Sequence, residues 1–164
     1  MSTPLDAASA RLDLTLAEVE QEASFLAFVA AEITPYAEQF EASASLPPEL
    51  CRLLAERGYL ASFVPEASGG KGLSMVAYGL LQAALARGSA SVQSLSTVHG
   101  MVALAVLRWG SPSLKERFLA PLARADVLAA FALTEPGAGS DIQAIEATAQ
   151  ADGDAFVITG QKRW

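Results

Sequence analysis

A run of small and polar residues late in the chain has the composition of a ligand-binding loop. Residues 134–141 read TEPGAGSD and follow a short apolar stretch. Gly137 and Gly139 lack the Cβ atoms that would keep a ligand away from the backbone, and they permit a positive φ. The hydroxyls of Thr134 and Ser140 can both donate and accept hydrogen bonds. These residues predict a loop that binds a polar, flat or phosphorylated ligand, although a tight turn between two strands has the same composition.

Four segments of the chain resemble the acyl-CoA dehydrogenases, in the order in which that family has them. They are VPEASGGKG at 64–72, GSPSLKERFLAPLA at 110–123, FALTEPGAGSD at 131–141 and ITGQKRW at 158–164. The similarity runs from about Leu16 to Trp164, and members of the family are flavoenzymes that oxidise acyl thioesters. The resemblance implies a mostly α fold, with an N-terminal helical domain followed by the first strands of a truncated β-barrel-like domain.

The resemblance also implies FAD as the cofactor and indicates the residues that would contact it. By motif position these are Phe131, Leu133, Thr134, Gly139, Ser140 and Trp164. We expect the Thr134 hydroxyl to bond the pyrimidine end of the isoalloxazine, where such donors stabilise the negative charge of the reduced ring. Ser140 is expected to contact the thioester side of the substrate as well. Trp164 is expected to pack on the flavin, with the covering of a sheet edge as the alternative.

We expect no catalytic residue in this chain. The family reaction takes a proton from Cα and a hydride from Cβ of the acyl thioester, so it needs a base near Cα. In the family this base is a glutamate of a C-terminal helical bundle, a region that the 164 residues do not reach. Glu135 is expected to have a structural role instead, with its carboxylate bonding neighbouring amides of the loop.

Two further residues are candidates for substrate contacts, because the helix expected at 90–109 corresponds to one near the acyl pocket of the family. Its start, SVQS at 91–94, resembles the glutaryl-CoA branch and makes Ser94 a candidate. The VHGM stretch at 98–101, which contains His99, resembles the acyl-carrier-protein dehydrogenases of polyketide pathways that make extender units such as methoxymalonyl. A lone helical histidine is more often packed and hydrogen-bonded than part of a pocket, so both roles stay open for His99.

The resemblance implies partners as well. We expect the substrate to be an acyl-CoA or an acyl carrier protein thioester, the electron acceptor to be an electron-transfer flavoprotein, and the full-length enzyme to be a homo-oligomer. An acyl-CoA oxidase or a flavin monooxygenase on the same fold is an alternative, because this half of the fold hardly separates these activities. An inactive helical module that binds no flavin is the third hypothesis.

The composition limits these hypotheses. A net charge of −7, from 18 acidic and 11 basic residues, disfavours nucleic acid as a partner. Cys51 is the sole cysteine, which excludes an internal disulfide and fits a cytoplasmic location. The first residues lack the basic and apolar regions of a secretory signal, and the longest apolar runs are expected to be too short to span a bilayer. We find neither a metal-ligand cluster nor the spacing of a P-loop.

Hydrophobic periodicity and helix-end signals divide the chain into a tail at 1–13, a helical domain at 14–126 and the beginning of a β domain at 127–164. Helices are expected at 14–41 with an interruption at Pro35, from 47 to Gly58, from Ser74 to Gly88, at 90–109, and from Ser111 to about Pro121. The helix at 90–109 is almost wholly apolar and is expected to be buried on most sides. Strands are expected at 127–133, 144–150 and 155–159, with a hairpin turn at 152–154.

The apolar strands at the end of the sequence have no later segment in it to cover them. We therefore expect the 164 residues to be the N-terminal part of a longer enzyme or a truncated product, without dehydrogenase activity in isolation. The isolated chain is also expected to aggregate or to depend on a partner, because its apolar strand faces stay open.

Overall fold

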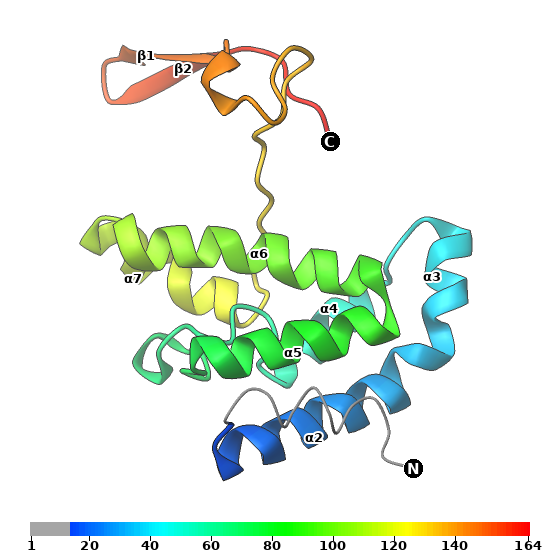
Figure 1. Cartoon of the computed structure of the whole chain (residues 1–164). Coiled ribbons are helices and arrows are strands. Elements are labelled where there is room, and N and C mark those ends of the chain that lie inside the picture. The colour runs from blue at the N-terminus through cyan, green and yellow to red at the C-terminus, as the bar shows by residue number, and fades with distance from the viewer. Residues whose placement is uncertain (1–13) are drawn as a thin grey trace. The chain divides into compact units, whose positions relative to one another are not determined.

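The computed structural model describes residues 14–164, so the tail expected at 1–13 lies outside the described residues. The chain divides into two compact units, one ending at Ala129 and one running from Ala130 to Trp164. The first unit is helical and the second contains a β-hairpin (Figure 1). This is the expected mostly α fold, and the division lies close to the expected domain boundary at 126.

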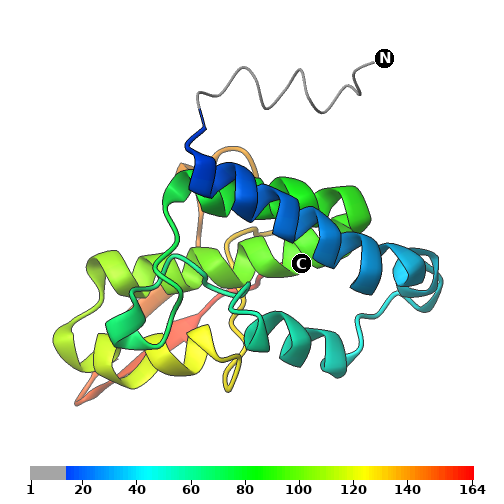
Figure 2. The same ribbon diagram turned by 90° about the horizontal axis from the view of Figure 1, so that it is seen from below.

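Six helices of the described chain build the first unit. They are α2 (Leu16–Glu32), α3 (Ala37–Ser43), α4 (Pro48–Glu56), α5 (Met75–Gly88), α6 (Ala90–Trp109) and α7 (Pro112–Ala123), with short 3₁₀ turns η1 (Thr34–Tyr36) and η2 (Glu66–Ser68). Helix α2 packs on α5, α5 on α6, and α6 on α7 (Figures 1 and 2). The chain thus forms a bundle in which α5 and α6 are the central elements.

The helix ends follow the local signals of the sequence. The expected interruption at Pro35 is confirmed, because α2 ends at Glu32 and η1 separates it from α3. Ser74 caps α5 by accepting a hydrogen bond from Ala77 N–H (3.0 Å). Ser111 caps α7, whereas Pro121 lies inside that helix, which ends two residues later at Ala123. Side-chain oxygens that satisfy the first N–H groups of these helices therefore define where the helices begin.

Two hydrophobic clusters form the core of the helical unit. In the first, the ring of Tyr59 meets Phe25 and Phe28 edge to face, with ring centroids 5.3 and 5.0 Å apart. The second joins the segment after α4 to α6 and α7; its members are Ala61, Phe63, Val64, Ala103, Leu119, Leu122 and Ala123. All residues from Tyr59 to Val64 are buried, so this irregular segment passes through the interior between the two clusters.

Helix α6 differs from the sequence expectation in two ways. Its residues buried below a tenth of their surface lie on one face, and Val98, Met101 and Trp109 are exposed, so the prediction of burial on most sides is wrong. The reason is that α6 packs against α5 and α7 on one side, and its apolar residues exceed what that side can cover. By length and composition α6 could also cross a membrane, with a mean hydropathy of 1.4, so the expectation that every apolar run is too short is wrong as well. Its buried face packs on α5 and α7.

The second unit has fewer strands than expected. The antiparallel hairpin of β1 (Thr148–Asp152) and β2 (Ala155–Thr159) is confirmed, with Asp152 opposite Ala155 and Gly153 in the turn at φ +59°. The strand expected at 144–150 begins four residues later, because a 3₁₀ turn, η3 (Ile142–Ala144), comes first. No strand forms at 127–133 in the described chain, since no neighbouring strand shares its backbone hydrogen bonds.

Candidate functional site

The loop at 134–141 begins with a tight turn. Glu135 N–H donates to Ala138 O (2.9 Å) and Ala138 N–H donates to Glu135 O (3.2 Å), so these two residues close the turn reciprocally. Ala138 is buried, whereas Phe131 and Leu133, which precede the turn, are 48% and 38% exposed. The turn is therefore fixed by its own backbone, and the apolar side chains before it remain open to other groups.

The two glycines of the loop are not required by its backbone. Neither Gly137 nor Gly139 has a positive φ, so the expectation that glycine serves this purpose here is wrong. A Cβ at either position would meet no atom within 4 Å. In contrast, a Cβ at Gly70 would collide with the carbonyl oxygen of Val64. The loop glycines thus leave open space that the described chain does not fill.

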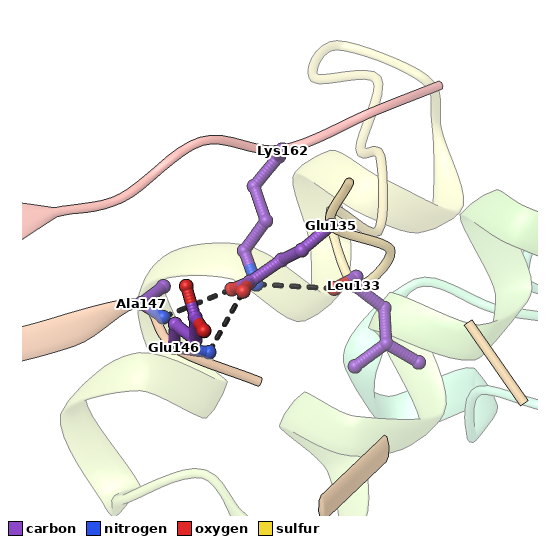
Figure 3. Close-up of polar contacts among 5 residues, drawn as sticks. All are labelled: Leu133, Glu135, Glu146, Ala147 and Lys162. Atoms are coloured by element: carbon purple, nitrogen blue, oxygen red, sulfur yellow. Dashed lines mark hydrogen bonds and ion pairs between the residues drawn. The ribbon is translucent and has the colours of Figure 1, made fainter. Parts of the chain in front are cut away.

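The carboxylate of Glu135 organises the second unit (Figure 3). Its Oε2 accepts a hydrogen bond from Glu146 N–H (2.7 Å), and its Oε1 accepts one from Ala147 N–H (3.0 Å). The ammonium of Lys162 lies 2.8 Å from Oε1. Glu135 is 7% exposed, and its carboxylate bonds backbone amides as expected, although these amides belong to residues 146 and 147 and not to the loop itself. Its partners lie 11, 12 and 27 residues along the chain, so it ties three segments together.

Charge and hydrogen bonding keep Glu135 ionised. The hydrogen bond from Lys162 and the amide of Glu146 hold the pKa of the Glu135 carboxyl below its ordinary value, against the opposing effect of burial; the amide of Ala147 and the charge of Lys162 add to the lowering. The carboxylate is committed to these donors. A carboxylate that is bonded by three donors and has a lowered pKa suits a structural anchor better than a proton acceptor.

The segment after β2 returns to the start of the loop. Lys162 Nζ donates to Leu133 O (3.0 Å) in addition to Glu135, and Arg163 N–H donates to Thr134 O (2.9 Å). The structure thereby places Thr134 beside the residue that precedes Trp164. Sequence reasoning named Lys162 only as part of a motif, and its two contacts could not be found from local signals, because both partners lie more than 25 residues away.

The other predicted cofactor residues carry uncommitted groups. Thr134 is half-buried, and its hydroxyl makes no hydrogen bond to the described residues; the same is true of the exposed Ser140. The side chain of Trp164 is fully exposed. A hollow of about 350 Å³ lies in this unit and is lined by Gly137, Gly160 and residues around them, but by none of these three. The side chains of Ser140 and Trp164 are thus open to solvent, whereas Thr134 is half-buried.

Comparison with known proteins places the chain in a family. Residues 17–126 match the family model described as the acyl-CoA dehydrogenase N-terminal domain. The chain belongs to the acyl-CoA dehydrogenase family. Among curated relatives, the bovine (Bos taurus) mitochondrial short-chain specific acyl-CoA dehydrogenase is 36% identical over 138 residues, covering 84% of this chain and 34% of the relative. The glutaryl-CoA dehydrogenase of Desulfococcus multivorans is 35% identical over 142 residues, covering 84% and 36%.

A solved structure gives the same result for the fold. A glutaryl-CoA dehydrogenase from Mycobacterium smegmatis, in complex with FADH2, superposes with a TM-score of 0.87 at 31% identity, covering 92% of this chain and 39% of that chain. The chain spans about a third of the length of the curated relatives it matches. The resemblance stated from the sequence is therefore confirmed at the level of family and fold.

Two of the three predicted substrate residues of this acyl-CoA dehydrogenase family member, Ser94 and His99, lie in the helical unit. Ser94 is exposed on α6. His99 is fully buried: its Nε2–H donates to Leu122 O (2.8 Å), and its Nδ1 accepts from Ala129 N–H (3.3 Å). Burial lowers the pKa of His99, against the hydrogen bond to Leu122. Both ring nitrogens are used within the fold, which is the packed role left open by the sequence; a substrate contact by Ser94 stays a prediction.

A partly buried polar network between α5 and α6 was not foreseen from the sequence. Gln82 Nε2 donates to Ser96 Oγ (2.9 Å), Thr97 Oγ1 donates to Gln82 Oε1 (2.8 Å), and Gln93 Nε2 donates to Thr97 Oγ1 (2.6 Å). Ser96 Oγ also donates to Tyr59 O (3.3 Å). The spacing of the three α6 members, at one helical turn or less, is the signal that places them on one face. Within residues 14–164, no cluster of His, Cys, Asp or Glu is suited to hold a metal ion.

Proposed function

We propose that this chain forms part of an FAD-dependent acyl thioester dehydrogenase in which the 134–141 loop and Trp164 contact the flavin. The observation that carries the proposal is the set of uncommitted groups on this loop, in a chain that belongs to the acyl-CoA dehydrogenase family. The hydroxyls of Thr134 and Ser140 have no partner in the described residues, and the space above Gly137 and Gly139 is open.

These residues fit a flavin chemically. An isoalloxazine has apolar faces and a polar edge, so it needs apolar contacts beside hydrogen-bond donors. Phe131 and Leu133 offer exposed apolar surface, and Thr134 and Ser140 offer donors. Glycines at 137 and 139 allow a ligand to approach the backbone, and this explains their presence where neither φ nor local packing requires them.

The division of roles follows from the same contacts. A bound flavin would supply the acceptor for the hydride that leaves Cβ of the acyl thioester. Thr134 would donate to the electronegative edge of the ring, and Ser140 would contact the ring and the thioester side of the substrate. Glu135 is held by three donors, so we propose that the base for the Cα proton lies outside these residues.

Flavin binding is the experiment that tests the proposal. We expect the protein, as its natural source produces it, to retain FAD with flavin absorbance. Thr134→Val should weaken FAD binding about fivefold, the loss of one neutral hydrogen bond. Gly139→Ala should weaken it about tenfold or more, since the new methyl occupies space meant for the ligand. The measurement is FAD titration by fluorescence quenching with each variant.

Gly79→Ala is the matched control, because a Cβ there also meets nothing within 4 Å but lies on α5, in the helical unit. Equal FAD affinity for Gly139→Ala, Gly79→Ala and the unmodified protein would contradict the assignment of the loop. A protein that neither retains nor binds FAD would contradict the proposed function and favour a helical module without flavin.

Finer features of the function are proposals of the same kind. Bound FAD together with fast oxidation by O₂ would favour an oxidase or monooxygenase, whereas turnover with an electron-transfer flavoprotein would favour a dehydrogenase. Comparing acyl-CoA with acyl carrier protein thioesters as substrates decides the carrier, including the polyketide branch. The cytoplasmic location and the homo-oligomer remain predictions from the sequence and the resemblance.

A further inference from the structure

Three consecutive residues at the start of the loop accept hydrogen bonds from two consecutive residues after β2. Lys162 Nζ donates to Leu133 O (3.0 Å) and to the Glu135 carboxylate (2.8 Å), while Arg163 N–H donates to the oxygen between them, Thr134 O (2.9 Å). Figure 3 shows the Lys162 side chain reaching between Glu135 and the Leu133 carbonyl. The ammonium of Lys162 therefore bonds the residues on both sides of Thr134, which carries the predicted flavin donor.

We propose that Lys162, anchored by Glu135, is a positioning residue that fixes the register between Thr134 and Trp164 and so presents both side chains to one flavin. The inference rests on the proposed function of the loop. It assigns a role to two residues that are not themselves expected to touch the cofactor, and it makes their ion pair part of the site.

The hydrogen bonds fix the backbone at Leu133 and Thr134 and leave the Thr134 side chain unbonded. The carbonyl oxygens of Leu133 and Thr134 are used by Lys162 and Arg163, so the two peptide planes cannot rotate without breaking these bonds. The Thr134 hydroxyl makes no bond to the described residues, so the fixed backbone sets where its Cα–Cβ bond points and leaves the hydroxyl available to a ligand. Trp164 follows Arg163 directly, so the bond from Arg163 N–H to Thr134 O also sets where the tryptophan begins.

Burial makes the pair more than a surface salt bridge. The Glu135 side chain is 6% exposed and that of Lys162 is 31% exposed. Exposed ion pairs contribute little, whereas a carboxylate that is buried and left without its cation is costly. The two backbone donors, Glu146 N–H and Ala147 N–H, would still bind the carboxylate after loss of Lys162, so the turn would persist. Of its three bonds to residues 133–135, the 162–164 segment would keep the one from Arg163 N–H to Thr134 O and lose the two from Lys162.

The test compares Lys162→Met with Lys162→Arg in the protein as its natural source produces it. Lys162→Met should weaken FAD binding about tenfold or more and alter the band shape of the flavin spectrum, because loss of a hydrogen bond to a charged group at a buried site is a cost of this size. Lys162→Arg keeps the cation and should restore most of the affinity and the spectrum. Lys115→Met, the same change on α7 in the helical unit, should alter neither property.

Amide hydrogen exchange gives a readout that does not need the cofactor. In the flavin-free protein, Lys162→Met should speed exchange of the Arg163 amide about tenfold or more, while amides of α5 keep their protection. If Lys162→Met does not accumulate, Lys162→Gln replaces it, since an amide donor can still reach a carbonyl but carries no charge. Helix content by circular dichroism checks that the helical unit is folded in every variant.

The outcomes separate the two proposals. Wild-type FAD affinity, flavin spectrum and Arg163 exchange in Lys162→Met would overturn the positioning role and leave the proposed function standing. An unmodified protein that binds no FAD would overturn both. Weaker FAD binding in Lys162→Met, with rescue by Lys162→Arg and faster Arg163 exchange, supports the positioning role.

Discussion

The single histidine has a structural role in the helical unit. His99 has no exposed surface, and both ring nitrogens bond backbone groups, one at the end of α7 and one at Ala129. Because a carbonyl oxygen can only accept, Nε2 carries the proton and Nδ1 accepts from Ala129 N–H, so the ring is neutral. A second proton on Nδ1 would break the bond to Ala129 and place an unpaired charge in the core.

This neutral ring predicts an acid-sensitive helical unit. Burial lowers the pKa of His99 in the folded state, so the unfolded state binds more protons as the pH falls below about 6.5. Stability from this residue is present above that pH and is lost as the pH falls through the folded pKa, with a slope of up to about 1.4 kcal/mol per pH unit. Urea unfolding between pH 8 and pH 5 should show this slope in the natural protein.

His99→Gln provides the control for the acid sensitivity, because glutamine can hydrogen-bond but does not titrate in this range. We expect the variant to be less stable at pH 8 and to lose less of its stability on acidification. The same slope in both proteins would assign the acid sensitivity to other groups. Carboxyl groups contribute mainly below about pH 5, so the chosen window isolates the histidine.

At the scale of the elements, the segment between α4 and α5 depends on one glycine. The segment folds back on itself, with Leu73 N–H bonding Ser62 O (3.0 Å) and Gly72 N–H bonding Val64 O (2.9 Å). A Cβ at Gly70 would strike the Val64 carbonyl, and Val64 is fully buried, so the neighbour has no room to give. The glycine-rich run at 69–72 has neither the spacing nor the preceding strand of a P-loop. Close backbone packing requires Gly70, whereas Gly69 and Gly72 adopt a positive φ of +87° and +61°.

We therefore expect Gly70→Ala to destabilise the helical unit by about 1–3 kcal/mol, the typical range for overpacking and backbone displacement in a core. Gly79→Ala meets open space on α5 and should be neutral or stabilise by up to about 1 kcal/mol. Chemical denaturation of both variants is the measurement. A Gly70→Ala protein as stable as Gly79→Ala would show that the segment can shift away from Val64.

The elements also show which features can be predicted from sequence. The interruption at Pro35 and the caps at Ser74 and Ser111 were predicted correctly because a helix end is determined by residues within four positions of it. The strand expected at 127–133 was wrong because an apolar run becomes a strand only when another strand pairs with it. The burial of α6 was overestimated for a similar reason, since composition does not say which faces a helix finds partners for.

In the candidate site too, features that depend on local residues could be predicted, and features that depend on distant partners could not. The loop, its hydroxyls and the structural role of Glu135 could be predicted, because they follow from residue types and from a motif. The partners of Glu135 could not, since Glu146, Ala147 and Lys162 reach it only through a turn and a hairpin. Of the two reasons given for Gly137 and Gly139, the open space for a ligand agrees with the structure, whereas the positive φ does not occur at either residue.

For the whole molecule, the distribution of buried apolar residues predicts unequal stability of the two units. Both hydrophobic clusters consist of residues up to Ala129. From Ala130 onward, the residues that are buried are Glu135 and Ala138, and Phe156 and Ile158 on β2 are 70% and 78% exposed. A two-stranded hairpin with so little burial is marginal in water, so its order depends on hydrogen bonds such as those of Glu135.

We expect residues 1–129, expressed alone, to keep the helix content of this unit and to unfold cooperatively, with a Tm within a few degrees of that of the helices in the 164-residue chain, since the residues that form its core are all retained. The shorter chain should also aggregate less, because it lacks the exposed apolar residues of β2. Thermal melts followed by circular dichroism, with light scattering on both chains, make the comparison.

Loss of cooperative unfolding in residues 1–129 would mean that the helical core draws stability from residues 130–164. Equal scattering from the two chains would instead assign aggregation to the exposed face of α6, where Val98, Met101 and Trp109 lie.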